Sequence, residues 1–313
     1  DGGIASTIDA DSEGKEGKFY VWTKPEIDSL LGADAEFFTE AYDVTANGNW
    51  EGVTILNRSN TPEPYSSEQE ATLNRCRAIL FDERANRIHP GWDDKILTDW
   101  NGLAISALAQ AGAMFDRSDW TLAATTAFDF IQRTLGRDNR LYHNWRKGRL
   151  GDMATLEDYA FMIRAAIKLY ETTGNILYVT QAEGWMATLD EFYLDRENGG
   201  YFFTASDAEN LIIRRKTVSD NATPSGNGIL AEALARLYFL TGNDSYRQSS
   251  ENIITAFSGE AEKNIFPLAA LLNAAEALLN TTQIVIIGKP DNAATQQLVT
   301  AALAAFSPLH LLN

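Results

Sequence analysis

Three stretches of the chain repeat one pattern of polar and apolar positions. Each begins with a polar cluster, continues as an almost wholly apolar run of helical length, and ends at a short turn that an aromatic residue follows. The three turns lie at Asp116, Gly174 and Gly242. A repeat of this length predicts stacked supersecondary units, and each apolar run with its more polar successor forms a helical hairpin.

The polar clusters occupy equivalent positions in the three repeats. When the turns are aligned, Asp99 coincides with Glu157 and Ser225. A second aligned set, two positions further on, consists of Asn101, Tyr159 and Asn227. Because each cluster precedes its apolar helix, the repeats line up their polar groups along one rim. We therefore expect the functional site at this rim.

The two helices of a repeat differ in polarity. The run 103–115 is apolar or small on every side, which predicts a helix enclosed by others. The following segment, 119–135, carries Asp129, Gln132 and Arg133 on one face, as a helix with a solvated side does. The predicted fold is all-α: an (α/α)6 toroid with an inner and an outer ring of helices and short β-hairpin insertions at 140–149 and 200–216.

Further elements flank the repeats. Segments 2–8 and 17–22 predict strands, and Thr23 with Glu26 three positions later predicts a capping box that starts a helix reaching about Tyr42. The opening GGIAST at 2–7 is echoed by GGYFFT at 199–204, which indicates the same structural device twice. A strand at 283–288 and a helix near 291–306 complete the chain. We predict a toroid over residues 1–280 and a small C-terminal α/β element over 281–313.

Composition excludes several classes of protein. The net charge of -17 has no compensating basic stripe, which disfavours binding to nucleic acid or to an anionic membrane. No apolar run is suited to span a bilayer. Cys76 is the sole cysteine, so an internal disulfide and a cysteine-based zinc site are excluded, and we expect a buried structural thiol. Acidity and scarce cysteine suggest a cytoplasmic location. The chain opens without Met, which suggests a fragment.

Several motifs in a fixed order resemble one known family. They are DADSEG (9–14), EGKFYVWT (16–23), GNWEG (48–52), DDKILT (93–98), WNGL (100–103), LEDYA (156–160), GGYFFT (199–204) and PSGN (224–227). Together they resemble the family of spermatogenesis-associated protein 20 and its bacterial relatives, from Gly2 to about Gly288. The resemblance implies a toroid of six helical hairpins, similar to those of N-acylglucosamine 2-epimerases and six-hairpin glycosidases. It also implies an upstream thioredoxin-like domain, absent from this chain together with the first hairpin, and it brings no settled reaction.

Carboxylates near the helix starts are the candidate catalytic groups. Asp94, Asp158 and Asp220 would act as acid–base groups or accept sugar hydroxyls. Glycoside hydrolysis needs two carboxyl groups roughly 5 to 9 Å apart, which carboxylates from different repeats could provide. The alternative is a structural role at helix N-termini, where carboxylates cap N–H groups. Helix neighbours point about 100° apart, so we expect Asp158 to face the centre and Glu157 to cap.

Aromatic and polar residues at the same rim are candidates for ligand binding. They are Trp50, Glu51, Asp93, Trp100, Asn101, Glu157, Tyr159, Lys216 and Asn227. Indole faces beside carboxylates suit the C–H faces of sugars, although indoles also anchor loops to a core. Lys216 could hold an anionic substituent, but an ion pair with Asp220 is the favoured interpretation.

Other chemistries find little support. Epimerases of this fold use paired histidines, whereas His89, His143 and His310 lie outside the motifs and begin no inner helix. Ser225 lacks the context of a nucleophile elbow, and no phosphate-binding loop is present. We predict no metal and no cofactor.

Three functional hypotheses remain. The first is a carbohydrate-active or carbohydrate-binding protein with an acidic, aromatic pocket at the rim and a sugar-like small-molecule ligand. The second is a non-catalytic binding or scaffold module that serves the upstream thioredoxin-like domain. The third, a 2-epimerase-like sugar isomerase, is disfavoured by the placement of the histidines.

Overall fold

The computed structural model describes residues 2–209, 212–289, 292–305, 307 and 309–313. The chain forms two compact units: unit 1 comprises Asp1–Ser6 and Asp94–Asn313, and unit 2 comprises Thr7–Asp93. Residues 281–313, predicted to form a separate element, fall within unit 1. They do so because helix α11 (Ala293–Ala304) packs against helix α4 (Thr98–Met114).

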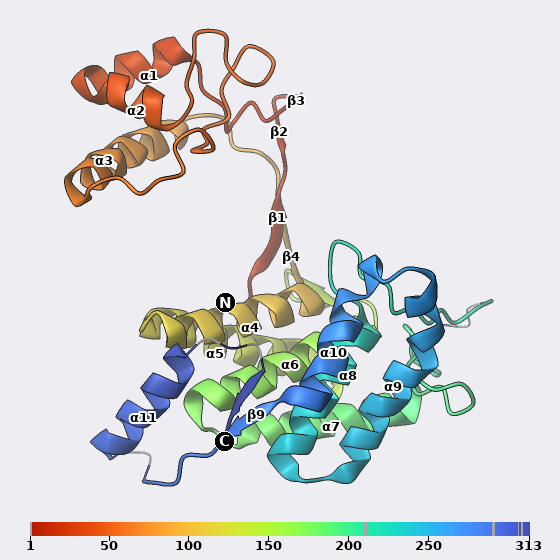
Figure 1. The fold of residues 1–313 in the computed structure, drawn as a ribbon. Coiled ribbons are helices and arrows are strands. Elements are labelled where there is room, and N and C mark those ends of the chain that lie inside the picture. The colour runs from red at the N-terminus through yellow and green to blue at the C-terminus, as the bar shows by residue number, and fades with distance from the viewer. Residues whose placement is uncertain (1, 210–211, 290–291, 306, 308) are drawn as a thin grey trace. The chain divides into compact units, whose positions relative to one another are not determined.

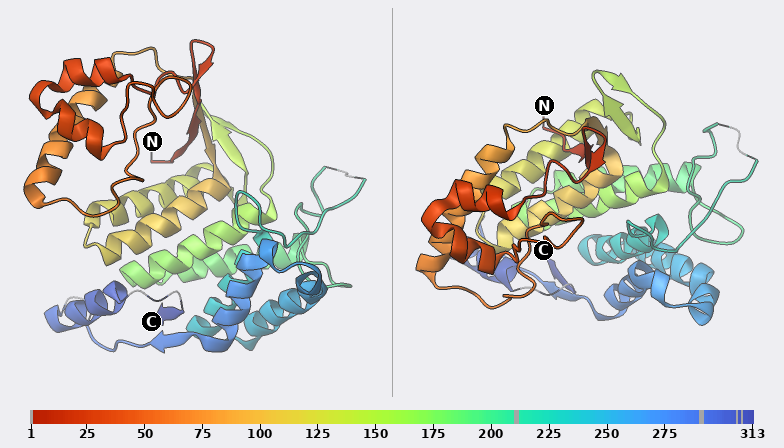
Figure 2. Two further views of the ribbon diagram at one scale, coloured as in Figure 1. Left: turned by 45° about the horizontal axis from the view of Figure 1, so that its top comes forward. Right: turned by 90° about the horizontal axis from the view of Figure 1, so that it is seen from above.

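Unit 1 is built from helical hairpins (Figures 1 and 2). The inner helices are α4, α6 (Leu156–Thr173), α8 (Gly226–Thr241) and α10 (Ala269–Asn280). The outer helices are α5 (Ser118–Thr134), α7 (Leu177–Phe192) and α9 (Asp244–Lys263). Each inner helix packs on the next, and each outer helix packs on the inner helix that precedes it in the chain. The predicted toroid of inner and outer helices is confirmed in this arrangement.

The core of unit 1 lies between the two helix layers. Helices α6 and α8 are buried on almost every side, and Phe161, Ile163 and Leu234 have no exposed surface. The prediction that the run 103–115 is enclosed on every side is wrong, because Ala107 and Phe115 of that run are exposed. Helix α5 buries Phe128 and Ile131 on one face only. Apolar burial of this kind supplies most of the favourable free energy of folding. It also fixes where the N-terminal ends of the inner helices lie.

The three predicted turns are confirmed. Helices α6 and α8 end at Gly174 and Gly242, both in the left-handed conformation with φ near +70° (69° and 71°). That conformation has no steric penalty for glycine, which is why glycine commonly ends helices. After α4 the equivalent position is Asp116, which adopts a φ of 52°.

Short strands accompany the helices. One sheet has the order β1 (Ala5–Ile8), β4 (Trp92–Leu97), β7 (Asn144–Arg146), β8 (Arg149–Leu150). A hairpin of β5 (Gly136–Arg137) and β6 (Arg140–Leu141) precedes β7, so the insertion predicted at 140–149 is present. The strand pair predicted at 200–216 is wrong for residues 200–209 and 212–216, where the structure has one bridge, between Leu194 and Tyr201. Side chains organise that loop instead: Arg214 donates to the carbonyl oxygens of Thr204 and Phe192.

The C-terminal residues form a βαβ unit. Strand β9 (Thr282–Ile284) pairs in parallel with β10 (His310–Leu312), and α11 connects them. The predicted helix is present and slightly shorter than predicted, whereas the strand predicted at 283–288 is reduced to Gln283 and Ile284, with Thr282 added at its start. A short 3-10 helix, η2 (Phe266–Leu268), leads into α10.

Unit 2 has its own small core. Its elements are β2 (Asp11–Ser12), β3 (Lys15–Glu16), α1 (Lys24–Leu31), the 3-10 helix η1 (Gly32–Asp34), α2 (Ala35–Ala41) and α3 (Ser67–Arg84). Trp22, Ile27, Phe38 and Leu73 are buried together with Cys76, whose thiol is free, as predicted. The capping box at Thr23 is confirmed. The strand predicted at 17–22 is reduced to one bridge, from Trp22 to Thr54.

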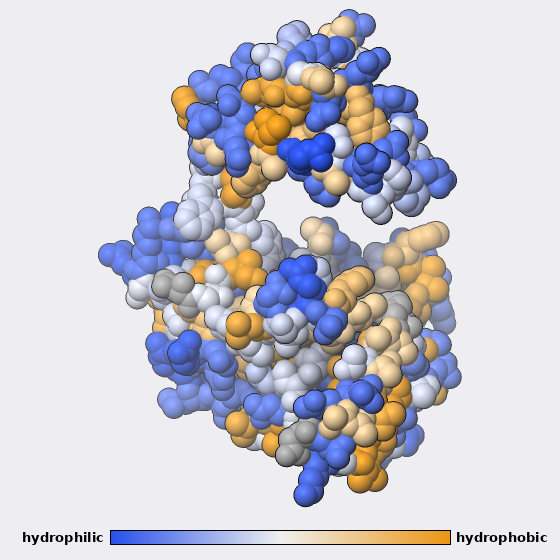
Figure 3. Space-filling model, turned by 90° about the vertical axis from the view of Figure 1, so that its left-hand side faces the viewer, coloured by the Kyte–Doolittle hydropathy of each residue, from blue (hydrophilic) through white to orange (hydrophobic). Residues whose placement is uncertain are grey.

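On the face that Figure 3 shows, the surface of both units is mixed in polarity. Exposed hydrophobic side chains include Phe81 in unit 2 and Phe115 and Leu122 in unit 1. Among the helices that the structure describes, none combines the length and the apolar character needed to cross a membrane.

Candidate functional site

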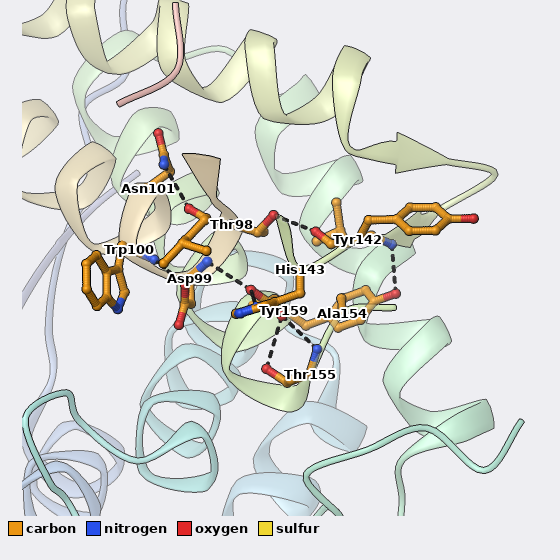
Figure 4. A network of polar contacts seen from close by, with 12 residues as sticks. Thr98, Asp99, Trp100, Asn101, Tyr142, His143, Ala154, Thr155 and Tyr159 are labelled. Carbon is orange, nitrogen blue, oxygen red and sulfur yellow. Dashed lines mark hydrogen bonds and ion pairs between the residues drawn. The ribbon is translucent and has the colours of Figure 1, made fainter. Parts of the chain in front are cut away.

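A cluster of ionisable groups lies at the N-terminal ends of α4 and α6 (Figure 4). Asp99 and Asp158 belong to the first turns of these helices, and His143 comes from the segment between β6 and β7. One oxygen or nitrogen atom from each of the three side chains lies within 4.8 Å of the others. The cluster therefore sits at the rim that the repeat pattern predicts.

Asp158 is the buried centre of the cluster. It has no exposed surface and accepts hydrogen bonds from Thr155 N (2.7 Å), Thr155 Oγ1 (3.0 Å) and Asp99 N (2.9 Å). His143 Nδ1 lies 3.0 Å from both of its oxygens. Asp158 thereby caps α6 and joins the starts of both inner helices. The expectation that Glu157 caps while Asp158 faces the centre is wrong, because the capping box on Thr155 uses Asp158.

His143 is the cation of the cluster. Its hydrogen bond to Asp158 raises the pKa of the imidazole to about 9, against the opposing effect of burial, and the charges of Asp158 and Asp99 add to the rise. The ring is therefore protonated at neutral pH. Its backbone is held as well, since Thr98 N donates to His143 O at 2.9 Å and His143 N donates to Asp152 O at 2.8 Å.

Two further carboxyl groups titrate near neutrality. Burial, followed by the charge of Asp158, raises the pKa of Asp99 to about 6. Burial, followed by the charges of Asp99 and Asp158, raises the pKa of Glu157 to about 7. Glu157 also packs closely against α8, because a Cβ atom at Gly226 would lie 3.0 Å from Glu157 Cγ. The rim thus holds two carboxyl groups able to exchange a proton at neutral pH.

The same cluster is poorly suited to a metal ion, although it offers one carboxylate or imidazole atom from each of three residues. Both oxygens of Asp158 already accept N–H or O–H donors, and His143 Nδ1 is bonded to one of the carboxylates. A cation would have to displace these bonds and leave backbone N–H groups of Asp99 and Thr155 without acceptors, which is unfavourable in a buried site.

Asp94 and Asp220, two of the predicted catalytic residues, have structural partners. Asp94 lies on β4 and pairs with Arg146 and, at 3.4 Å, with Lys147; the Arg146 hydrogen bond lowers its pKa. Asp220 accepts from Ser225 N (2.8 Å) and from Ala270 N (2.9 Å). It therefore connects the starts of α8 and α10.

Lys216 is engaged elsewhere than predicted. Its ammonium lies 2.6 Å from Asp195 Oδ2 and 2.7 Å from Gly199 O. The favoured ion pair between Lys216 and Asp220 is therefore wrong. The carboxylate of Asp220 accepts instead from the backbone N–H groups of Ser225 and Ala270, at the starts of two helices.

One aligned set of rim residues forms hydrogen bonds to backbone segments that are distant in the sequence: Asn101, Tyr159 and Asn227. Asn101 accepts from Ile4 N (2.8 Å) and donates to Ile4 O (2.9 Å). Asn227 repeats this with Tyr201, at 2.8 and 2.9 Å. The hydroxyl of Tyr159 accepts from Leu141 N at 2.9 Å. Ile4 and Tyr201 both follow the Gly-Gly pairs of the echoed motifs, so the echo has a structural basis.

The remaining candidates are divided between the units. Trp100 follows Asp99 and keeps 43% of its surface exposed, so its indole is accessible beside the cluster. Its backbone N–H donates to Asp99 Oδ1 at 2.8 Å. Trp50 and Glu51 belong to a turn in unit 2, closed by the bridge from Trp50 to Val53, and Asp93 is the last residue of that unit.

Two members of the cluster, Asp99 and His143, were absent from the predicted site. The signal for Asp99 was available, because the repeat alignment equates it with Glu157. His143 carries no such signal. It reaches the cluster through the strand insertion between two hairpins, and pairing of Ile96 with Trp145 brings that insertion beside α4.

Comparison with known proteins gives a consistent result. No protein-family model matches the chain. Spermatogenesis-associated protein 20 from rat and from human are each 30% identical over 98% of this chain and 45% of their own length. The chain thus spans about half the length of the curated relatives it matches.

A solved structure resembles this chain in fold. A GH76 alpha-mannanase from Bacteroides thetaiotaomicron superposes with a TM-score of 0.51 at 15% sequence identity, covering 76% of this chain and 67% of its own. At that identity the likeness concerns the fold alone. The relatives from rat and human confirm the predicted resemblance to the family of spermatogenesis-associated protein 20 over 98% of this chain. The likeness to the mannanase agrees with the predicted toroid of helical hairpins.

Proposed function

We propose that the rim cluster of unit 1 binds a carbohydrate or a similarly polyhydroxylated ligand and exchanges protons with it. The observation that carries the proposal is the pair of carboxyl groups whose pKa values stand near neutrality, about 6 for Asp99 and about 7 for Glu157. Groups that titrate near the working pH are the most effective general acids and bases.

Asp99 and Glu157 share the proton-exchanging role. Burial raises the pKa of both carboxyl groups toward neutrality, so each suits a general acid or a general base. Asp158 and protonated His143 position the pair and do not exchange protons themselves. The exposed indole of Trp100 supplies a face on which a sugar ring can stack. The toroid that this chain shares with a GH76 alpha-mannanase supports a carbohydrate as the ligand class.

Of the three residues predicted to be catalytic, Asp158 acts as a positioning residue, and Asp94 and Asp220 belong to the scaffold. Glu157 and Trp100 remain in the site, with Asp99 and His143 added. A two-histidine epimerase mechanism stays disfavoured, because His143 is the one histidine of the cluster.

Two measurements test the proposal: thermal unfolding in the presence of sugars, and turnover by variants of the rim residues. The chain would be melted with neutral, amino and acidic mono- and disaccharides, since a ligand that binds the folded state raises the midpoint by mass action. The ligand found would then be tested with Asp99→Asn and Glu157→Gln, with Asp119→Asn on the outer helix α5 as the matched control.

We expect both rim variants to lose turnover by about 10²-fold or more, the usual contribution of a general acid or base, with the control unchanged. Unchanged turnover in both rim variants would remove the assignment. A flat panel at millimolar sugar would favour the alternative, a binding module serving an upstream thioredoxin-like domain.

A further inference from the structure

A second group of charged side chains lies on the inner helices, further along α6 and α8 than the rim cluster. Arg164, Lys168 and Glu171 come from α6, and Glu232 and Arg236 come from α8. All of them except Glu171 line an open cavity of about 300 Å³, to which α4 contributes Gln110 and α10 contributes Asn273. A cavity of this size is at the lower end of small-molecule sites.

Three cations of this group share two buried carboxylates. Arg236 lies 2.9 Å from Glu232 and 3.8 Å from Glu171, and Lys168 lies 2.7 Å from Glu171. Arg164 comes no closer than 3.9 Å to Glu232. A further carboxylate on the lining, Glu276, is exposed and accepts from Asn280. The cavity lining thus carries three cationic side chains, Arg164, Lys168 and Arg236, and two carboxylates, Glu232 and Glu276.

Arg164 is the least satisfied of the three cations. Its Nε is buried and has no hydrogen-bond partner among the residues that the structure describes. Lys168 follows one helical turn later on the same face of α6, where two like charges repel each other. Both line the cavity. An anion placed between Arg164 and Lys168 would accept a hydrogen bond from the Arg164 Nε–H and reduce the repulsion between the two positive charges.

We propose that this cavity binds a small oxyanion, the carboxylate or phosphate group of a metabolite, through Arg164 and Lys168. The planar guanidinium of Arg164 presents parallel N–H donors that match two oxygens of such a group, and the Lys168 ammonium adds a point charge. Burial together with the charge of Arg236 lowers the pKa of Lys168, and an anion would oppose that effect. The site is independent of the proton-exchanging rim.

The first test uses inorganic phosphate as the probe. The chain would be titrated with phosphate and, separately, with acetate as the carboxylate probe and acetamide as the neutral control, at fixed pH and ionic strength. Calorimetry should give saturable binding for one or both anions and none for acetamide. Arg164→Gln should weaken that binding about tenfold or more, because a charge-assisted pair is lost. Arg133→Gln, an exposed arginine on α5, is the matched control and should bind as the wild type does.

A second measurement does not depend on the folding of a variant. The Nε–H resonance of Arg164 in the wild-type chain should shift on addition of the bound anion, and that of Arg133 should stay in place. The preferred anion identifies the chemistry as phosphate or carboxylate. Absence of saturable binding, equal affinity in Arg164→Gln, or an unmoved Arg164 resonance would each overturn the proposal.

Discussion

Replacement of Asp158 by Asn is the sharpest test of how the rim is built. If Asp158 were only an acid–base group, this substitution would abolish turnover and leave the fold intact. The structure predicts instead that the fold itself is weakened, because Asp158 has no exposed surface and accepts from the backbone N–H groups of both Asp99 and Thr155. An Asn side chain keeps one acceptor oxygen and turns an NH2 group toward these donors.

The magnitude follows from the contacts that are lost. Removing one partner of a buried ion pair destabilises a protein by about 3–5 kcal/mol. The loss here is at the lower end of that range, about 3 kcal/mol, because the His143 side chain is 29% exposed and releases its proton when its pKa falls. The capping contact to Thr155 is part of the same loss. In a domain of 150–250 residues, 1 kcal/mol shifts Tm by about 2–4 °C, so the expected decrease is roughly 6–12 °C.

The assay is urea unfolding at pH 7, followed by far-UV circular dichroism. Asp119→Asn is the matched control, because Asp119 is exposed and pairs only with Arg117 among the ion pairs that the structure records for it; its expected effect is below about 1 kcal/mol. In the Asp158→Asn variant the pKa of His143 should also fall from about 9 toward its ordinary value, which imidazole NMR measures. A loss of stability below about 1 kcal/mol, with the His143 pKa unchanged, would refute the reasoning.

Three further predictions concern the same helix starts. In the wild type, stability should fall as pH rises from 6.5 to about 9, because folded His143 keeps a proton that the unfolded chain releases. The fall is at most about 3 kcal/mol, reduced by the partial exposure of the ring, and urea midpoints of His143→Asn across this range should be flatter than the wild type. Gly226→Ala would place a Cβ atom 2.9 Å from Leu156 Cγ and 3.0 Å from Glu157 Cγ. We expect about 1–3 kcal/mol of destabilisation and a displaced Glu157 whose pKa changes, which carboxyl NMR detects; an unperturbed Glu157 signal would contradict this. Asp220→Asn should lose one of two bonds to backbone N–H groups and reduce stability by about 1.5–3 kcal/mol in the urea assay, against no change if these bonds are incidental.

The sequence was sufficient to predict the helical hairpins and the rim. Helical periodicity and end signals such as Gly174 and Gly242 depend on local chemistry, so they can be read from short windows. The repeat alignment also equates Asp99 with Glu157, whose pKa the charge of Asp99 helps to raise in the structure. A polar residue at a helix start can cap the helix or belong to a functional site, and hydrophobic periodicity does not distinguish these two roles.

Side-chain partners could not be predicted in the same way. Asp158 and Glu157 are adjacent, and which of them caps depends on the position of Thr155 and on the arrival of His143 from a distant insertion. Lys216 was expected to pair with Asp220, four positions away in the sequence. In the structure it pairs with Asp195, which is more distant in the sequence. Such choices are made by tertiary geometry, which a single sequence does not display.

The hydrogen bonds of Asn101 and Asn227 to distant backbone segments have a consequence for the order of folding. The contact between Asn227 and Tyr201 joins residues 26 positions apart, whereas the contact between Asn101 and Ile4 joins residues 97 apart. Closing the longer loop costs about 1 kcal/mol more in chain entropy. During synthesis, the segment around Ile4 must wait for Asn101 to leave the ribosome, and the whole of unit 2 emerges in between. The last hairpins can therefore fasten locally, whereas the first strand of unit 1 is held only once a complete second unit has been made.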